Sequence, residues 1–556
     1  MFTSFNAQEK EVHYPRDRKF YFILKRNFLF VAFLAVLIPL LFAWIQYLLL
    51  GLPLDPSLML PKNNEVAVKG FPIWVIFCHW LNFFFLIILI RSGLSILFDH
   101  PRLYWKKSSI PGSEWLKFTP KIVPKDKSWT AKDDARYLSP VIGLPGYRHS
   151  VGIARGWHFI HVPIFIITGL FFITMLFYTD QWQRVVPESF QIIPDAWKVF
   201  VHYATFNFPI EPNGFYNYNA LQKLSYFVVI FILAPLAILT GLCMSPSIGN
   251  RFPILPTLFG NRQGARSVHF IVMFAYLIFL IIHVSLVVLT GFVRNINHIT
   301  LGIDDGNNIT GVLIFSAIIL FTILFHFFAH WVSWQRPRWI QKFGAVLTGN
   351  LSRISINKFK PKANFKKEDI SHYFWTNGKL PKSEIWKNLA KNNFDDYKLV
   401  VGGLVENPVS LSLKELKNLG KEENITLHHC IQGWTGVAEW GGLPLKTLIE
   451  LVKPFSNAKN VAFYSFGEGL YGGKYYDTHT LDNCLKPQSI LAWEMNYKPL
   501  PIDYGAPLRL RVENQLGYKM VKWIERIEFV ESSENIEKGF GGKNEDDEYY
   551  DLIANI

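Results

Sequence analysis

Long apolar stretches alternate with polar segments over the first 335 residues, and this pattern predicts a membrane protein. Six stretches contain no Asp, Glu, Lys or Arg, and each reaches the roughly 20 residues that a helix needs to cross the hydrocarbon core. They cover residues 28–50, 71–90, 156–179, 224–250, 267–293 and 306–335. We therefore expect an all-α bundle of six transmembrane helices over residues 28–335, preceded by an N-terminal tail at 1–27.

The pattern changes after residue 370 to short strands and short helices. We expect strands at Tyr397–Val405, Asn424–Cys430, Asn460–Ser465, Leu508–Val512 and Val521–Val530, and helices starting at Ser412 and covering Leu443–Val452. The predicted unit is a soluble, mixed α+β, β-rich domain over residues 371–535. A basic linker at 336–370 precedes it, and an acidic tail at 536–556, interpreted as solvated, follows it. No glycine-rich nucleotide-binding motif follows a strand, so nucleotide chemistry has no support.

Charge divides the chain in the same way, with a net +18 over residues 1–370 and −4 over the rest. The N-terminal tail and alternate loops hold 27 Lys and Arg, whereas the loops on the opposite side hold five. Because positive loops stay inside, we expect a multi-pass protein of the inner membrane with both termini and the soluble domain in the cytoplasm. The basic residues separate apolar runs, which indicates lipid rather than nucleic acid as the partner. The linker either lies on anionic headgroups or only sets topology. A homo-oligomer is compatible with the sequence.

Histidines inside the apolar stretches are the first candidate functional residues, because polar groups in spans are costly. His79 lies in the second span, His158 and His161 open the third, and His269 and His283 share the fifth. A spacing of 14 residues places His269 and His283 on nearly one helix face, about 21 Å apart. One helix would then serve two cofactor sites, as in bundles that hold haem between facing imidazoles.

The alternating direction of the spans supplies the partners of these two histidines. Span five starts inside, so His269 lies near the cytoplasm and His283 near the outer face. Span three also starts inside and brings His158 or His161 to the depth of His269. Span two starts outside and brings His79 to the depth of His283. We predict an inner and an outer bis-histidine haem; the alternative is a set of interhelical hydrogen bonds.

Three short strings around these histidines resemble the di-haem cytochrome b subunits of formate dehydrogenase and thiosulfate reductase type. They are Phe77-Cys78-His79-Trp80, Ala154-Arg155-Gly156-Trp157-His158-Phe159 and Ala265-Arg266-Ser267-Val268-His269-Phe270. The resemblance covers about residues 71–300. It implies two b haems, exchange of electrons with a quinone, and His158 rather than His161 as the ligand.

Other polar residues in the spans have less specific interpretations. Arg155 and Arg266 precede the inner ligands by three residues, so they either pair with haem propionates or reach the headgroups. His326 and His330 are four residues apart in the sixth span. For these two we favour packing or propionate contact over quinone chemistry or a third haem.

Cys430 ends a predicted strand and precedes Ile431-Gln432-Gly433-Trp434. A lone cysteine is commonly a small buried apolar residue. A soft thiolate is also the ligand that a heavy metal such as molybdenum would take from a protein. The residues alone leave both interpretations open.

Two separated motifs resemble the sulfite oxidase superfamily, over about residues 371–530. They are His428-His429-Cys430-Ile431-Gln432-Gly433-Trp434 with Glu439-Trp440-Gly441-Gly442-Leu443-Pro444-Leu445, and Gly505-Ala506-Pro507-Leu508-Arg509-Leu510-Arg511 with Gly517-Tyr518-Lys519-Met520-Val521-Lys522-Trp523. The resemblance implies that Cys430 binds the molybdenum of a molybdopterin cofactor and that Arg509 and Lys522 hold its phosphate. Further implied cofactor contacts are Ser465, Tyr504, Met520 and Val521, with His372, Trp375 and Thr376 in an N-terminal loop. Cys484 and His479 have no counterpart and are interpreted as surface residues.

These motifs together predict a membrane-bound molybdenum oxidoreductase that exchanges electrons with quinone through two b haems. After residue 370 the chain has only three arginines, at 509, 511 and 526. This scarcity favours reduction of a neutral S- or N-oxide over oxidation of the sulfite dianion. His428 or His429 would supply protons, or both simply pack in their strand. Two alternatives are an electron carrier with a non-catalytic soluble domain and a transporter with buried histidines.

Overall fold

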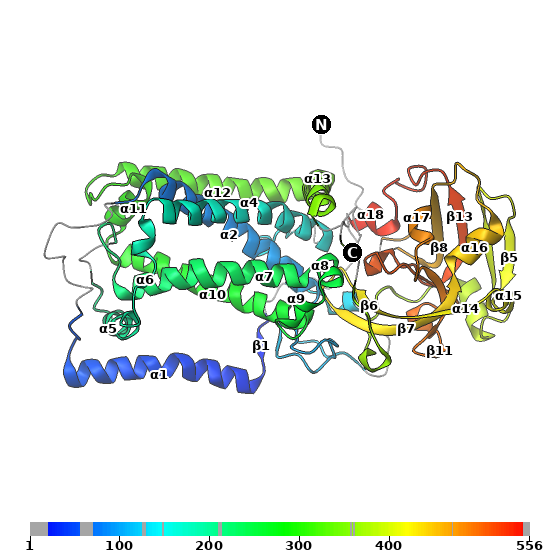
Figure 1. Cartoon of the computed structure of the whole chain (residues 1–556), viewed down its shortest axis with the longest axis horizontal. Helices are drawn as coiled ribbons and strands as arrows, with labels where there is room; N and C mark the ends of the chain where they lie inside the picture. Colours follow the sequence, from blue (N-terminus) through cyan, green and yellow to red (C-terminus); the bar gives the residue numbers. More distant parts are fainter. Residues whose placement is uncertain are drawn as a thin grey trace.

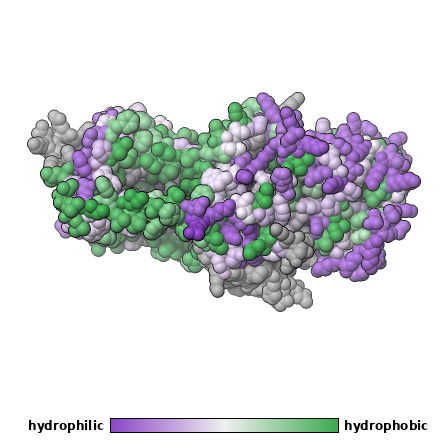
Figure 2. All heavy atoms as spheres, turned by 90° about the horizontal axis from the view of Figure 1, so that it is seen from below, coloured by the Kyte–Doolittle hydropathy of each residue, from purple (hydrophilic) through white to green (hydrophobic). Residues whose placement is uncertain are grey.

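The computed structural model describes residues 21–55, 70–124, 129–146, 150–209, 214–355, 359, 362–469, 471–548 and 556, with side chains left out at 348–355. Parts of the predicted tails at 1–27 and 536–556 and of the linker at 336–370 therefore lie outside the described residues. Figure 1 shows a long helical bundle at one end and a β-rich domain at the other. On the face shown in Figure 2, apolar residues predominate over the bundle and hydrophilic residues predominate over the β-rich domain.

The six predicted spans are confirmed as helices. They are α1 (Arg26–Leu50), α2 (Ile73–Asp99), α4 (Val151–Tyr178), the continuous run Ala220–Met244, α10 (Arg262–Leu289) and α12 (Thr310–Gln335). The run at 220–244 consists of α6 (Ala220–Phe227), a π-helical segment (Val228–Leu233) and α7 (Ala234–Met244). Several helices extend beyond the prediction because an uncharged run ends at the first charge, whereas α2 continues through Arg91 and α4 includes Arg155.

The spans form two closely packed pairs, α2 with α4 and α7 with α10, which meet each other less closely. Helix α1 lies to one side and contacts α5 (Ile192–Ala204), where Trp197 Nε1 donates to Gln46 Oε1 at 2.9 Å. Helix α11 (Phe292–Thr300) connects α10 to α12. The predicted basic linker contains a helix, α13 (Pro337–Ser355), whose Ile340 packs in a cluster with Trp157 of α4.

The C-terminal domain consists of two five-stranded sheets around one apolar core. One sheet has the order β11-β10-β7-β6 with β12 also paired to β10, and the other has the order β5-β4-β13-β8-β9. Their bounds are β4 (Lys398–Gly403), β5 (Val409–Ser412), β6 (Glu422–His429), β7 (Thr435–Pro444), β8 (Asn460–Glu468), β9 (Lys474–Thr480), β10 (Ile490–Met495), β11 (Lys498–Pro499), β12 (Arg509–Arg511) and β13 (Ile524–Val530). Among these described strands, β13 and β4 pair in parallel and the other pairs are antiparallel. The five predicted strands and the two helices, α15 (Leu413–Asn418) and α16 (Leu445–Val452), are confirmed within a few residues.

Two interpretations of the C-terminal segment are wrong. The acidic tail forms α18 (Lys543–Glu548), in which Glu545 and Asp546 are buried, because Lys519 binds Glu545 and the Tyr476 hydroxyl donates to Asp546. His479 and Cys484 are also buried rather than on the surface, at 3 % and 1 % exposure. The His479 ring donates to the carbonyl of Lys519, so it belongs to the same internal network.

Candidate functional site

The histidines predicted for the inner site carry matching hydrogen bonds. His158 Nδ1 lies 3.1 Å from Ser92 Oγ, and His269 Nδ1 lies 2.9 Å from Thr240 Oγ1. Each hydroxyl also donates to the main-chain carbonyl four residues earlier, at 2.7 Å. The hydroxyls therefore accept from Nδ1–H, which leaves the lone pair of Nε2 on both rings for a metal.

Two helical glycines border these rings. A side-chain carbon added at Gly93 of α2 would lie 3.5 Å from His158 Cε1, and one at Gly241 of α7 would lie 3.9 Å from His269 Cε1. Small residues at these points leave room for a flat macrocycle beside the imidazoles. His161 Nδ1 also donates to a carbonyl, that of Trp157 at 2.7 Å, so its Nε2 is free in the same way. Its ring, however, stacks on the Trp157 indole, and no glycine among the described residues borders it. The preference for His158 over His161 stays a prediction.

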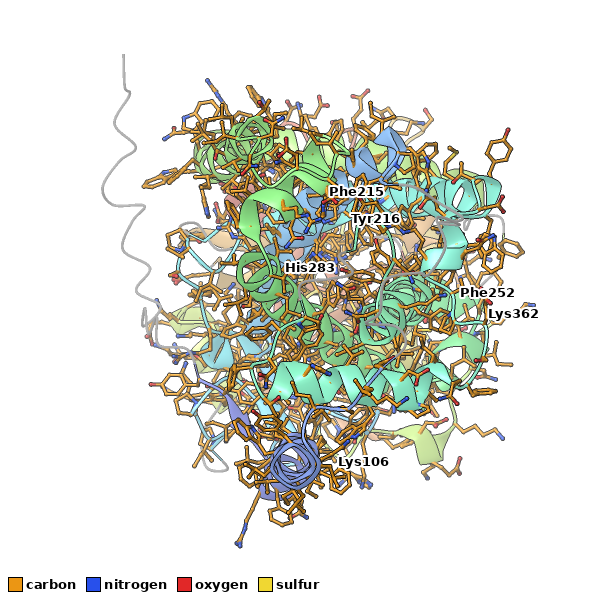
Figure 3. All side chains as sticks on the ribbon, turned by 90° about the vertical axis from the view of Figure 1, so that its left-hand side faces the viewer. Lys106, Phe215, Tyr216, Phe252, His283 and Lys362 are labelled. Carbon is orange, nitrogen blue, oxygen red and sulfur yellow. The ribbon has the colours of Figure 1, made fainter. Side chains whose placement is uncertain are left out.

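The two histidines predicted for the outer site, His79 and His283, lie close to each other. The ring centres of His79 and His283 lie 6.4 Å apart. When two imidazoles bind the same iron from opposite sides, each through a nitrogen at about 2 Å, their ring centres lie about 6 Å apart. The Nδ1 atom of His79 is buried and has no hydrogen-bond partner among the described residues. Viewed from the end of the bundle, His283 projects into its interior (Figure 3), so the donors fit a second haem.

The two histidines of the sixth span, His326 and His330, contact Arg91 of α2. Arg91 of α2 lies within hydrogen-bond distance of His326 Nδ1, at 2.5 Å, and of His330 Nε2, at 2.9 Å. The same guanidinium donates to the Pro140 and Gly143 carbonyls. These contacts tie α12 to the 139–146 loop, as the packing interpretation of His326 and His330 expects.

Cys430 lies at the tip of the β6–β7 hairpin and is buried, at 3 % exposure. A tight turn holds it, in which Gly433 N donates to the Cys430 carbonyl at 3.1 Å and Gly433 has a φ of +107°. Asn377 Nδ2 donates to Cys430 Sγ at 3.2 Å. Burial raises the pKa of the thiol to about 12, so a thiolate here needs a cation such as a bound metal. Asn377 was missed by the sequence interpretation, because no motif includes it.

Arg509 and Lys522 converge on Gly505. A side-chain carbon at Gly505 would lie 3.2 Å from Arg509 Cβ and 3.1 Å from Lys522 Cβ. Burial and then Arg511 lower the pKa of Arg509 to about 9, and burial and then Arg509 lower the pKa of Lys522 well below its ordinary value. Neither side chain forms a salt bridge among the described residues, and the buried Arg509 Nε has no hydrogen-bond partner there, so both groups fit a phosphate dianion.

The other residues predicted to contact the cofactor differ in their burial and in their hydrogen bonds. Trp375 is buried and donates to the Ser109 carbonyl at 2.7 Å, and Thr376 donates to the Trp129 carbonyl. The Ser465 hydroxyl donates to the Lys522 carbonyl at 2.6 Å, so its observed contact positions Lys522. The Tyr504 hydroxyl donates to the Phe374 carbonyl. Met520 and Val521 are buried in the domain, whereas His372 is exposed.

The two histidines before Cys430 are both buried. Arg511 donates to His428 Nδ1 at 3.0 Å, and the His428 ring fits against Gly517, where an added carbon would come within 2.2 Å of it. His429 Nε2 lies 3.2 Å from Asn250 Oδ1. The contacts of His428 agree with the packing alternative, and the proton-supplying role of either histidine stays a prediction.

Residues of the membrane domain complete the surroundings of Cys430. Arg262 and Gln263, in the first turn of α10, donate to the Gly433 carbonyl at 2.8 and 3.0 Å. Arg266 lies beside Gly433, since an added carbon there would be 3.4 Å from Arg266 Nε. Counting arginines only after residue 370 therefore missed those that the bundle brings to this face. Only tertiary structure reveals them.

Facing imidazoles among helices of membrane-spanning length, and a buried thiol in a domain with two buried basic side chains, are typical of a membrane-bound redox protein. Comparisons with known families agree. Residues 70–302 match the model of prokaryotic cytochrome b561, and residues 387–537 match the oxidoreductase molybdopterin binding domain. The chain therefore joins a membrane domain similar to cytochrome b561 to a C-terminal domain similar to the oxidoreductase molybdopterin binding domain. The two predicted resemblances are thereby confirmed, and the domains imply haem b and a molybdenum cofactor.

Relatives are known for parts of the chain. The protein-methionine-sulfoxide reductase catalytic subunit MsrP of Xanthomonas axonopodis pv. citri is 36% identical over 176 residues, which cover 30% of this chain and 54% of that protein. The putative protein-methionine-sulfoxide reductase subunit YedZ1 of Azospira oryzae is 34% identical over 137 residues, which cover 25% and 50%. The chain thus spans about half the length of the curated relatives it matches.

One solved structure also matches, the sulfane dehydrogenase SoxCD from Paracoccus pantotrophus. Its sequence identity is 20%, its TM-score is 0.23, and the match covers 25% of this chain and 39% of that chain.

Proposed function

We propose that this protein oxidises a membrane quinol and uses the electrons to reduce an S- or N-oxide at a molybdenum centre. For a sulfoxide, one quinol and one sulfoxide give one quinone, one sulfide and one water. Two electrons and two protons leave the quinol, and two of each are consumed as the sulfur–oxygen bond breaks and its oxygen becomes water. When bound, the molybdenum cofactor supplies the two-electron, oxygen-atom step, and the haems supply single-electron steps. The names of the relatives MsrP and YedZ1, both methionine-sulfoxide reductase subunits, support an S-oxide.

The observation that carries this proposal is the hydrogen-bonded contact between the Cys430 turn and α10. Arg262 holds the Gly433 carbonyl, and His269 follows seven residues later on the same helix, about 10 Å along its axis. His283 lies on that helix as well. One rigid helix therefore connects the thiol of the soluble domain with both imidazole pairs.

Each haem has an assigned set of protein groups in this proposal. His158 and His269 hold the inner haem, and His79 and His283 hold the outer haem. Arg155 and Arg266, one helical turn before the inner ligands, pair with the propionates of the inner haem. The positive charge of the loops supports a cytoplasmic molybdenum domain, which would take up the protons for reduction from the cytoplasm.

The metal content of the purified protein tests the proposal. Protein from a host that makes molybdopterin should contain one molybdenum and two haem irons per chain. Cys430→Ser should keep both irons and lose turnover with an S-oxide, whereas Cys484→Ser, the matched change at the other buried cysteine of the domain, should keep both metals and turnover. Iron without molybdenum in the unaltered protein would contradict the proposal.

Oxidation of sulfite is the second candidate, because Arg262 and Arg266 bring positive charge to the face of Cys430. The two directions differ in their effect on the haems. Sulfite would reduce oxidised haems in the isolated protein, whereas an S-oxide would oxidise reduced haems. We favour oxide reduction, because both guanidinium groups donate to main-chain carbonyls and the inner haem supplies propionates for Arg266.

A further inference from the structure

The face of the molybdopterin domain that carries Cys430 is covered by the membrane domain. Cys430, Gln432 and Trp434 are each at most 3 % exposed. Ile431, in the same turn, packs in one cluster with Val151 at the start of α4. The thiol thus lies at the junction of the two domains and not on an open surface. In Figure 1, strand β6 reaches the end of the helical bundle.

Hydrogen bonds close this junction on several sides. Arg262 and Gln263 hold the Gly433 carbonyl, and Gln432 Nε2 donates to the Asp99 carbonyl at 3.2 Å. Two further bonds link the soluble domain to the 99–109 loop of the membrane domain. Trp375 donates to the Ser109 carbonyl at 2.7 Å, and the Thr435 hydroxyl donates to the Lys107 carbonyl at 3.4 Å.

The same loop presents buried polar groups that lack hydrogen-bond partners among the described residues. Both ring nitrogens of His100 and the hydroxyl of Tyr104 are of this kind, and neither side chain is exposed. The His100 ring contacts the Trp375 ring edge-on, with centres 5.0 Å apart. Trp375 lies two residues before Asn377, which donates to the Cys430 thiol. Burial of polar groups without hydrogen bonds is costly, so a polar ligand is expected to bind them.

We propose that the membrane domain forms the wall of the substrate site and limits the substrate to small oxides, with His100 and Tyr104 as the wall residues that contact the oxide. This inference rests on the proposed function and goes beyond it. A methionine sulfoxide in a folded protein brings a broad surface with it, and the closed junction excludes such a surface. Dimethyl sulfoxide or free methionine sulfoxide has only a few heavy atoms and is admitted. The named relatives, by contrast, are called protein-methionine-sulfoxide reductases.

The test compares substrates of different size on the holoenzyme with quinol-reduced haems. Reoxidation of the haem absorption band should follow addition of dimethyl sulfoxide or free methionine sulfoxide. A folded protein with oxidised surface methionines should act at least 100-fold more slowly per sulfoxide. Equal rates would overturn the inference and leave the proposed function intact. Loss of reoxidation with every oxide in the metal-replete protein would overturn both.

A variant and its matched control test whether the contacts between the two domains limit the size of the substrate. Arg262→Ala combined with Gln263→Ala removes the bonds to Gly433 and should raise the rate with the oxidised protein at least 10-fold relative to the small oxides. Arg251→Ala is the control, because Arg251 is a membrane-domain arginine that bonds Phe359 and Ser247 instead. If the rate with the oxidised protein relative to the small oxides stayed unchanged in the double variant, the proposal that the membrane domain limits substrate size would be contradicted.

A second readout does not depend on turnover. In protein made without molybdopterin, a maleimide on a 5 kDa polymer should modify Cys430 at least 10-fold more slowly than in the variant with Arg262→Ala and Gln263→Ala, as mass spectrometry of the Cys430 peptide would show. Equal modification of the two proteins would overturn the inference even if the oxides behaved as expected. His100→Leu should raise KM for small sulfoxides more than it lowers kcat, with metal content unchanged; an unaltered KM would remove His100 from the site.

Discussion

At the scale of single residues, the paired cations Arg509 and Lys522 give a prediction with two opposite effects. Lys522→Met should raise the thermal midpoint of the cofactor-free domain, because it removes a buried positive charge beside Arg509. The same change should reduce molybdenum content about 10-fold or more, because a charge-assisted bond to phosphate is lost. Differential scanning fluorimetry and metal analysis measure the two effects. Lys498→Met, at an exposed position of β11, is the control.

If Lys522→Met destabilised the cofactor-free domain, Lys522 would be a structural residue rather than an anion ligand.

His479 gives a prediction on pH. Burial lowers its pKa to about 3, whereas the unfolded chain titrates near 6.5. The unfolded state therefore binds the proton first as the pH falls, and stability is lost below about pH 6.5. Between pH 7.5 and 5.5 this residue should contribute a loss of about 1.4 kcal/mol. His479→Gln should remove that part of the loss in urea unfolding of the C-terminal domain followed by tryptophan fluorescence. An identical pH dependence in both proteins would show that folding does not shift the pKa of His479.

Chemistry-bearing residues were predictable where a motif holds them together. Helical spacing and alternating direction predicted His79, His269 and His283 as haem ligands. They left His158 and His161 open, and the cytochrome b resemblance favoured His158. Cys430 was predicted from its motif, and all of these assignments stay predictions. Asn377, Arg262 and His100 were not predictable, because they reach Cys430 only through the packing of the two domains. His479 and the acidic residues of α18 were misplaced for the same reason: their burial depends on partners such as Lys519 that are distant in sequence.

At the scale of elements, a comparison of glycine variants in α2 and α4 tests whether the inner haem site exists or the glycines serve helix packing alone. Gly93→Leu should push a side chain toward the His158 ring and lower haem content from two to one per chain. Gly169→Leu, at a helical glycine of α4 with open space around it, should leave haem content unchanged. A pyridine haemochrome assay counts the haems. Two haems in Gly93→Leu would contradict the inner site.

Elements with a strong local signal were predictable. The six spans follow from uncharged runs alone, and the capping box of Ser412 and Glu415 marks the start of α15. Strands β5, β7, β9, β10 and β11 were missed. The central strand β7 is buried along nearly its whole length, so its residues show no alternation between apolar and polar positions.

At the scale of the whole molecule, charge asymmetry predicts which side of the membrane holds the molybdopterin domain. Asn307→Cys, in the exposed connection between α11 and α12, should react with a membrane-impermeant maleimide in intact cells. Lys414→Cys, exposed on α15, should react only after the cells are opened. The four native cysteines are buried and give little background. Labelling of Lys414→Cys in intact cells would place the domain outside.

The most direct measurement of the central claim follows the haem absorption of the purified protein without oxygen. A quinol analogue should reduce the b haems, and a small sulfoxide added afterwards should reoxidise them, with one sulfide formed per two electrons. Cys430→Ser should be reduced by the quinol in the same way and should then stay reduced. Haems that remain reduced in the unaltered protein, with molybdenum bound, would contradict electron transfer from the membrane domain to the molybdenum centre.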